Sequence, residues 1–329
     1  MSRVTMKAAA VVVAAFIAAP GARAQDLTLK LPIDCEIGKS CWVQQYVDHD
    51  SAPGVKDYAC GGQTYDGHDG TDIRIRDTAS SAKVIASAEG TVKAVRDGED
   101  DRLMRTAADR ATIADRECGN GVVIAHDGGW ETQYCHLRNG SIAVKAGDAV
   151  TAGQALGAVG YSGMAAFPHV HLTVRKDGKA IDPFSAASDA AACGSAHDPL
   201  WTDDTLAALA YARGNIIRSG LAPGAVAMTA LEAGKLPGAG PSPDWPAMVD
   251  YAWAINLEAG DTITIRLEGP DGITAENTAT LDRAKAQYLL FAGKKRPAQG
   301  WPKGLYKAKI EVENGGTVRL SQSWQAAID

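Results

Sequence analysis

Short runs of alternating apolar and polar residues, separated by glycine turns, extend from Thr71 to about Val174. Alternation with a period of two places successive side chains on opposite faces of a strand. Asp-Gly and Gly-Gly pairs between the runs are typical of hairpin turns. The pattern predicts an antiparallel β-fold whose strands lie within TDIRI, KVIASAEGTVKAV, GNGVVIAHDGGWETQYCHL, SIAVKAGDAVTAGQALGAVGYS and HVHLTV.

One charged segment, residues 97–117, interrupts this pattern. Within it, Leu103, Met104, Ala107 and Ala111 have the spacing of one face of a short helix. We predict a solvated helical insertion between two strands. The alternative is a flap that walls one side of a substrate groove.

With 329 residues, the chain is long enough for two domains that each bury a core. Residues 25–195, including the insertion at 97–117, are predicted to form the first domain. Residues 196–248 are predicted to hold a connecting helix, capped near Thr202, and a Gly/Pro-rich segment. Strand-like runs in 249–329 predict a smaller, immunoglobulin-like β-sandwich. The predicted fold class is therefore mainly all-β.

Residues 1–24 have the pattern of a secretory signal peptide. Basic residues precede an apolar run, which ends in a small-residue pattern that predicts cleavage after Ala24. The apolar run is shorter than the roughly 20 residues that a membrane-spanning helix needs. We therefore expect a periplasmic or secreted protein with no membrane span.

Six cysteines follow the predicted cleavage point, an even number in a chain expected to reach an oxidising compartment. Disulfides are the default there. We hypothesise the pairs Cys35–Cys41, Cys60–Cys193 and Cys118–Cys135. Only the last pair has a local basis, because a hairpin about residues 127–129 would bring its two cysteines together.

The charge balance excludes one class of partner. Acidic residues outnumber basic ones, 39 to 33, and the basic residues form no cluster. We therefore expect no binding of nucleic acid.

Several histidines occur in patterns that suit a metal site. His169 and His171 alternate with apolar residues, so both imidazoles project from one face of a strand. In HDGTD, the spacing of four places His68 and Asp72 on the same side of extended chain, and Gly70 allows a close approach. Two imidazoles and one carboxylate satisfy the three-ligand count of a catalytic zinc. Spacing alone does not decide between His169 and His171 as the third ligand.

The remaining histidines divide into two groups. His136, in QYCHL, and whichever histidine of HVH is left free could transfer protons or bind an oxyanion. His49, His126 and His197 have no partner motif, and we interpret them as surface or satisfied polar residues.

Four motifs follow one another along the chain: YDGHDGTD, QYCHL, VKAGDAVTAGQALGAVGYSG and FPHVHL. In this order they resemble the lysostaphin/LytM-type zinc metallopeptidases. The resemblance extends from about Tyr65 to Pro183, and the C-terminal third of the chain lies outside it.

The resemblance implies a set of roles for individual residues. It implies that His68, Asp72 and His171 bind Zn²⁺, and that His136 and His169 carry the acid/base and oxyanion chemistry. It also implies a zinc metalloendopeptidase that hydrolyses stem or cross-link peptides of peptidoglycan.

Other interpretations stay open. Members of this fold class that have lost ligands serve as activators or scaffolds, but here all five positions are filled, which favours an enzyme. A secreted protease that acts on proteins would have the same zinc site. A biotinyl or lipoyl carrier would need a lysine at a hairpin tip, where Lys145 does not lie.

Two features depart from the resemblance. The long insertion at 97–117 leaves the shape of the groove open. Cys135 directly precedes His136, and strand alternation predicts that its side chain points away from the zinc.

Overall fold

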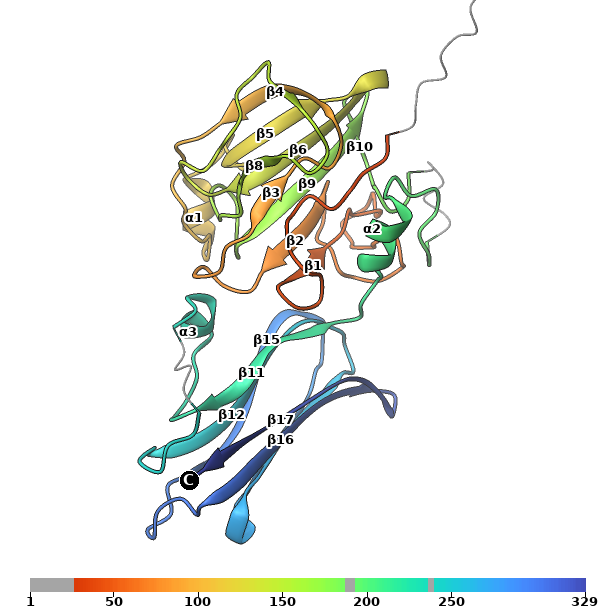
Figure 1. Ribbon diagram of the computed structural model, residues 1–329. Helices are drawn as coiled ribbons and strands as arrows, with labels where there is room; N and C mark the ends of the chain where they lie inside the picture. Colours follow the sequence, from red (N-terminus) through yellow and green to blue (C-terminus); the bar gives the residue numbers. More distant parts are fainter. Residues whose placement is uncertain (1–26, 187–192, 236–239) are drawn as a thin grey trace, which may run out of the picture.

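The computed structural model describes residues 27–186, 193–235 and 240–329. Two β-rich units lie end to end (Figure 1). The predicted signal peptide falls outside the described residues. Within them, no helix has both the length and the apolar character needed to cross a membrane.

An antiparallel sheet forms the centre of the first unit. Within the described residues its strands lie in the order β1-β2-β9-β6-β5-β4-β7, with β10 paired to β9, and β3 and β8 form a separate small sheet. Both sheets contribute side chains to one hydrophobic core, for example Ile73 and Val170 from the first and Val84 and Leu156 from the second. The bounds are β1 Cys41–Gln45, β2 Thr71–Ile75, β3 Lys83–Ile85, β4 Gly90–Arg96, β5 Asn120–Ala125, β6 Trp130–Leu137, β7 Ala149–Val150, β8 Ala155–Ala158, β9 His169–Lys176 and β10 Lys179–Ile181.

The helix in the charged insertion is shorter than the sequence predicts. Helix α1 spans only Ala107–Ala111, behind a capping box that begins at Thr106. Before it, the chain is bonded to another loop, because the Met104 N–H donates to the Ala165 carbonyl at 2.8 Å. The predicted helical face that included Leu103 and Met104 is therefore wrong. Met104 is buried against a loop instead of on a helix.

The stretch predicted as a connector has more structure than expected. Thr202 caps helix α2, Asp203–Ala208, as the sequence suggests. The same stretch then supplies β11, Asn215–Ala222, which pairs with β12 of the second unit, and helix α3, Met228–Glu232. The second unit thus begins well before residue 249.

Two antiparallel sheets form the second unit, which we call the C-terminal sandwich. Their strand orders are β11-β12-β15 and β14-β13-β16-β17. Both sheets contribute to one core, in which Ala254 from the first sheet belongs to the same hydrophobic cluster as Ile265 and Ile310 of the second. The immunoglobulin-like topology stays a prediction. The bounds are β12 Ala247–Leu257, β13 Thr262–Glu268, β14 Thr274–Thr280, β15 Lys285–Lys295, β16 Gly304–Asn314 and β17 Thr317–Ile328.

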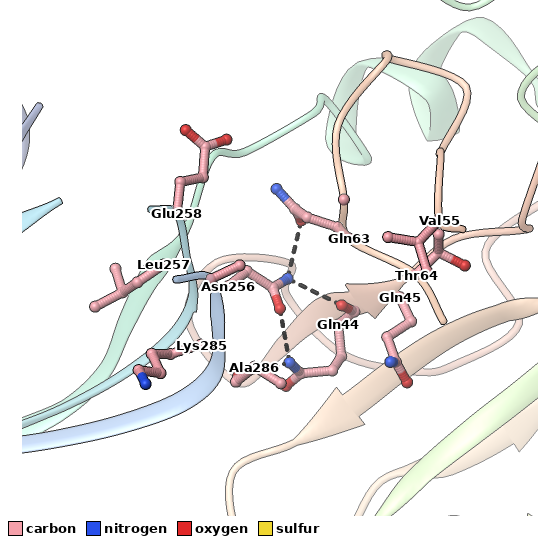
Figure 2. Close-up of a pocket in the computed structure, with 12 residues that line it drawn as sticks. Gln44, Gln45, Val55, Gln63, Thr64, Asn256, Leu257, Glu258, Lys285 and Ala286 are labelled. Atoms are coloured by element: carbon pink, nitrogen blue, oxygen red, sulfur yellow. Dashed lines mark hydrogen bonds between the residues drawn. The ribbon is translucent and has the colours of Figure 1, made fainter. Parts of the chain in front are cut away.

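The two units meet along a mixed apolar and polar contact. Trp42 of β1 belongs to the same hydrophobic cluster as Tyr251 and Ile255 of β12. Beside it, the side chain of Asn256 accepts a hydrogen bond from Gln44 at 2.7 Å and donates one to Gln63 at 2.9 Å. Figure 2 shows these amides at the edge of a cavity of about 300 Å³ between the units. This contact joins the sandwich to the strands that carry the candidate site.

All three hypothesised disulfides are confirmed: Cys35–Cys41, Cys60–Cys193 and Cys118–Cys135. Three bonds of this kind fit an extracellular protein.

Asp250 of β12 is a buried carboxyl that makes stability depend on pH. Burial raises its pKa to about 8, although a hydrogen bond from the Trp324 indole partly opposes the shift. The folded chain therefore binds a proton that the unfolded chain releases near pH 4. The stability from this group is present below about pH 4 and is lost as the pH rises through 8.

We accordingly expect Asp250→Asn to stabilise the protein more at pH 8.5 than at pH 4.5. The gain in the free energy of unfolding should be larger at pH 8.5 than at pH 4.5 by roughly 4 kcal/mol, since each pKa unit corresponds to about 1.4 kcal/mol. Urea unfolding at both pH values measures it. An equal effect at the two pH values would contradict a raised pKa for this carboxyl.

Candidate metal centre

Three buried side chains bring one donor atom each to a common point. His68 Nε2 lies 3.1 Å from His171 Nδ1 and 3.3 Å from Asp72 Oδ1, and His171 Nδ1 lies 2.8 Å from the same oxygen. They form a group that could hold a metal ion. These are the three residues that the resemblance to lysostaphin/LytM-type peptidases implied as ligands.

The sheet explains why two of the three donors meet. In the antiparallel pairing of β2 with β9, Asp72 lies directly opposite His171, so the two side chains share a face. Gly70 lets the strands approach, because a Cβ there would lie 2.5 Å from the His171 ring. His68 reaches the same point from the turn before β2, and not from extended chain as the spacing suggested.

Hydrogen bonds to the other ring nitrogens fix which atom of each histidine is a donor. His68 Nδ1–H donates to the Tyr46 carbonyl at 2.6 Å. His171 Nε2–H donates to the Thr173 hydroxyl at 2.9 Å, with Asp69 Oδ1 3.3 Å away. His68 Nε2 and His171 Nδ1 are therefore left with lone pairs that face Asp72. Outer hydrogen bonds of this kind are usual around metal-ligating histidines.

Thr173 and Asp69 were not identified from the sequence. Thr173 could have been, because it follows His171 by two residues on the same face of the strand. Asp69 lies inside the HDGTD motif, but only the folded chain shows that it faces His171.

The electrostatics of the cluster favour a cation. Burial raises the pKa of Asp72, but the charges of His68 and His169 and hydrogen bonds from two imidazoles outweigh it and hold the pKa well below its ordinary value. Burial lowers the pKa of His171, yet its bonds to Asp69 and Asp72 raise it to about 9. The buried carboxylate and the imidazoles around it therefore form a site that favours positive charge.

His136 and His169 lie beside the three donors, with ring centroids 4.5 Å apart. The Nδ1–H of His136 donates to the Ser162 carbonyl at 2.8 Å, and that of His169 donates to the Phe167 carbonyl at 2.8 Å. Burial lowers both pKa values, that of His136 the more strongly. Both imidazoles are therefore neutral at neutral pH, with the Nε2 lone pair available.

The expectation that Cys135 points away from this site is wrong. Strand alternation fails here because His136 has a φ of 62°, and the pairing of β5 with β6 shifts at the same place. Cys135 pairs with His171 across β6 and β9, so it shares the face of the metal site. Its disulfide partner Cys118 accepts the His136 N–H through its carbonyl at 2.9 Å. The disulfide thus braces the backbone that carries His136.

The three other histidines are satisfied or exposed, as interpreted. His49 Nε2 lies 2.6 Å from Asp182, and His126 bonds the Glu89 carbonyl. His197 pairs by its backbone with Ser185.

The donor set fits zinc. A tetrahedral zinc with ligands at about 2.0–2.1 Å keeps them about 3.3 Å apart, close to the spacings found here. Imidazole and carboxylate are ligands that zinc takes, and three of them leave a fourth position open. Two imidazoles and a carboxylate, with two further histidines beside them on a β-sheet, are typical of a metal-dependent hydrolase.

Part of the first unit is similar to known peptidases. Residues 66–183 match the model of Peptidase family M23. A stretch of 69 residues is 39% identical to the DD-carboxypeptidase/endopeptidase Mpg of Neisseria meningitidis and of Neisseria gonorrhoeae. The match covers 21% of this chain and 15% of those proteins.

Two of the solved structures that resemble part of this chain are catalytic domains of peptidases. One is the catalytic domain of the prophage-encoded M23 protein EnpA from Enterococcus faecalis, 26% identical over 42% of this chain and 88% of that one, with a TM-score of 0.29. Another is the catalytic domain of lysostaphin from Staphylococcus simulans, 22% identical over 42% of this chain and 85% of that one, with a TM-score of 0.27.

Proposed function

We propose that this chain is an exported zinc metalloendopeptidase that hydrolyses peptide bonds in the stem or cross-link peptides of peptidoglycan. The observation that carries the proposal is the meeting of His68 Nε2, Asp72 Oδ1 and His171 Nδ1 within hydrogen-bonding distance of one another in a buried site. We assign these three as the zinc ligands. Bound Zn²⁺ would supply Lewis-acid activation of water and of the scissile carbonyl.

His136 and His169 are assigned the proton transfers. Each has its Nδ1–H committed to a backbone carbonyl, so Nε2 is the basic atom. Either neutral imidazole can take a proton from the attacking water and return it to the leaving amine. Once protonated, an imidazole can donate a hydrogen bond to the oxyanion of the tetrahedral intermediate.

The substrate class rests on the family and the relatives. The Mpg proteins carry endopeptidase in their name, and lysostaphin is described as an antimicrobial peptidase. The disulfides support an extracellular place of action. The experiment below identifies which bond of the peptidoglycan peptides is cleaved.

Purified zinc-loaded protein should be incubated with two peptidoglycans, one cross-linked directly through diaminopimelate and one through glycine bridges. We expect peptide products from at least one of them, identified by mass spectrometry, and none from protein inactivated with a chelator. Casein serves as a protein substrate in a parallel incubation. Cleavage of casein, with both peptidoglycans left intact, would point to a general secreted protease. Intact substrates throughout, with no zinc in the purified protein, would point to a non-catalytic scaffold.

A further inference from the structure

Arg74 of β2 is a fully buried cation between the two units. Its guanidinium carbon lies 4.9 Å from the ring centroid of Phe167, in the first unit, and 5.1 Å from that of Trp253, in β12 of the sandwich. A guanidinium is attracted to the face of an aromatic ring, and the attraction is stronger where water is excluded. Figure 1 shows β2 at the end of the first unit that faces the sandwich.

The hydrogen bonds of Arg74 also join the two units. Its Nη1 donates to the side-chain oxygen of Gln44 at 2.8 Å and to that of Gln287, in β15, at 3.2 Å. Its Nη2 donates to the Arg76 carbonyl at 3.2 Å. Within the described residues, these acceptors and the Ile75 carbonyl are all amide oxygens, and none is a carboxylate.

A buried charge with no carboxylate among its hydrogen-bond partners is costly to keep. The negative charges of Glu232 and Asp77 offset only part of the effect of burial on Arg74. Burial lowers the pKa of Arg74 to about 9, which leaves it charged at neutral pH. An apolar residue between Phe167 and Trp253 would pack without that cost. The position of Arg74 relative to the catalytic candidates supplies a reason to keep it.

Arg74 reaches His169 by two routes. It lies directly opposite His169 in the pairing of β2 with β9. It also packs on Phe167, which contacts His169 in two ways. The Phe167 carbonyl accepts a hydrogen bond from His169 Nδ1 at 2.8 Å, and the two ring centroids lie 4.5 Å apart. A shift of Arg74 would therefore move the ring and the carbonyl that orient His169.

We infer that Arg74 is a positioning residue for His169, and that the C-terminal sandwich sets its place through Trp253 and Gln287. The inference rests on the proposed function, in which His169 transfers protons. It makes the sandwich a structural part of the active site. Within the described residues, Arg74 donates no hydrogen bond to the three assigned metal ligands.

Arg74→Lys tests this with little change in size or charge, because lysine keeps the cation but loses the planar stack and the forked donors. We expect the zinc content to stay the same and KM to change little. The value of kcat should fall roughly 10- to 100-fold, because a small misplacement of a catalytic group has an effect of that size. The matched control is Arg76→Lys. The guanidinium carbon of Arg76 lies 5.6 Å from the ring centroid of Trp42, and its Nε donates a hydrogen bond to the Ile217 carbonyl of β11 at 3.2 Å. Arg76 thus also joins the two units, but through residues other than those that Arg74 contacts.

A second readout does not depend on the substrate. In zinc-loaded protein with labelled histidine, NMR gives a ring signal for His169 that is assigned by its loss in His169→Gln. This signal should move in Arg74→Lys and, by a smaller amount, in Gln287→Leu, and should stay in place in Arg76→Lys.

Unchanged kcat and an unmoved His169 signal in Arg74→Lys would overturn the inference. Changes in kcat and in the His169 signal that are as large in Arg76→Lys as in Arg74→Lys would also overturn it. An unmoved signal in Gln287→Leu alone would overturn the role of the sandwich. If the wild type leaves peptidoglycan intact, the proposed substrate fails, while the NMR comparison still decides the role of Arg74.

Discussion

His171→Ala is expected to purify with far less than one zinc per chain and to lose its peptidase activity. The Nδ1 atom of His171 lies closest to the Asp72 oxygen, at 2.8 Å, and the imidazole is the second nitrogen donor of the set. Loss of an outer-shell partner alone typically lowers metal affinity 10- to 100-fold, so loss of a ligand should cost at least about 100-fold. Zinc analysis by mass spectrometry, with titration of the metal-free protein, measures the effect.

His169→Ala is the matched control, because the two histidines lie on the same face of one strand. His169 Nε2 is 3.5 Å from Asp72 Oδ1, and its Nδ1 is committed to the Phe167 carbonyl. This variant should keep its zinc. Full zinc content in His171→Ala together with loss of zinc in His169→Ala would make His169 the zinc ligand in place of His171.

His136→Ala is expected to keep zinc at one per chain and to lose most of its turnover. His136 is buried beside the donors, but its Nδ1–H is bonded to the Ser162 carbonyl and it is not among the three grouped donors. A positioned acid or base contributes about 10²–10⁴-fold, so kcat should fall by that factor. Initial rates on a purified cross-linked peptide, with zinc content measured on the same sample, give both quantities.

The control for His136→Ala is His126→Ala. His126 belongs to the neighbouring hairpin, where its ring is bonded to the Glu89 carbonyl and the Thr132 hydroxyl. Activity should stay at the level of the wild type. Loss of zinc in His136→Ala would make His136 a ligand, and unchanged kcat would remove it from the mechanism.

The strands that bury one face were predictable. TDIRI corresponds to β2, and HVHLTV lies within β9. In both strands apolar residues that face the core alternate with polar ones, which gives the period of two that the sequence shows. β14, with sequence TAENTAT, could not be predicted this way, since it is an edge strand with mostly exposed side chains and no apolar alternation. The helix in the insertion was predicted too long because Met104 is held by a backbone bond to another loop.

The members of the candidate site were predictable, but parts of its geometry were not. Spacing pointed to His68, Asp72 and one histidine of HVH, and the family resemblance selected His171. The structure brings His68, Asp72 and His171 together. Alternation then failed at Cys135, because a positive φ at His136 rotates the chain at that point. Such a backbone departure depends on the shifted pairing of two neighbouring strands and leaves no mark on the local pattern.

Long-range contacts account for what else the sequence did not reveal. Arg74 reads as an ordinary polar residue of a strand, yet it lies between Phe167 and Trp253 and bonds to Gln287. Its partners are separated from it by many residues and by the connector. A pattern within one strand cannot indicate a buried cation that two units share.

Anomalous diffraction at the zinc edge, from crystals of the zinc-loaded protein, tests the central assignment most directly. We predict one strong peak in the described part of the chain, enclosed by His68 Nε2, Asp72 Oδ1 and His171 Nδ1. A peak bound by other side chains, or no peak at these three atoms in fully loaded protein, would contradict the account.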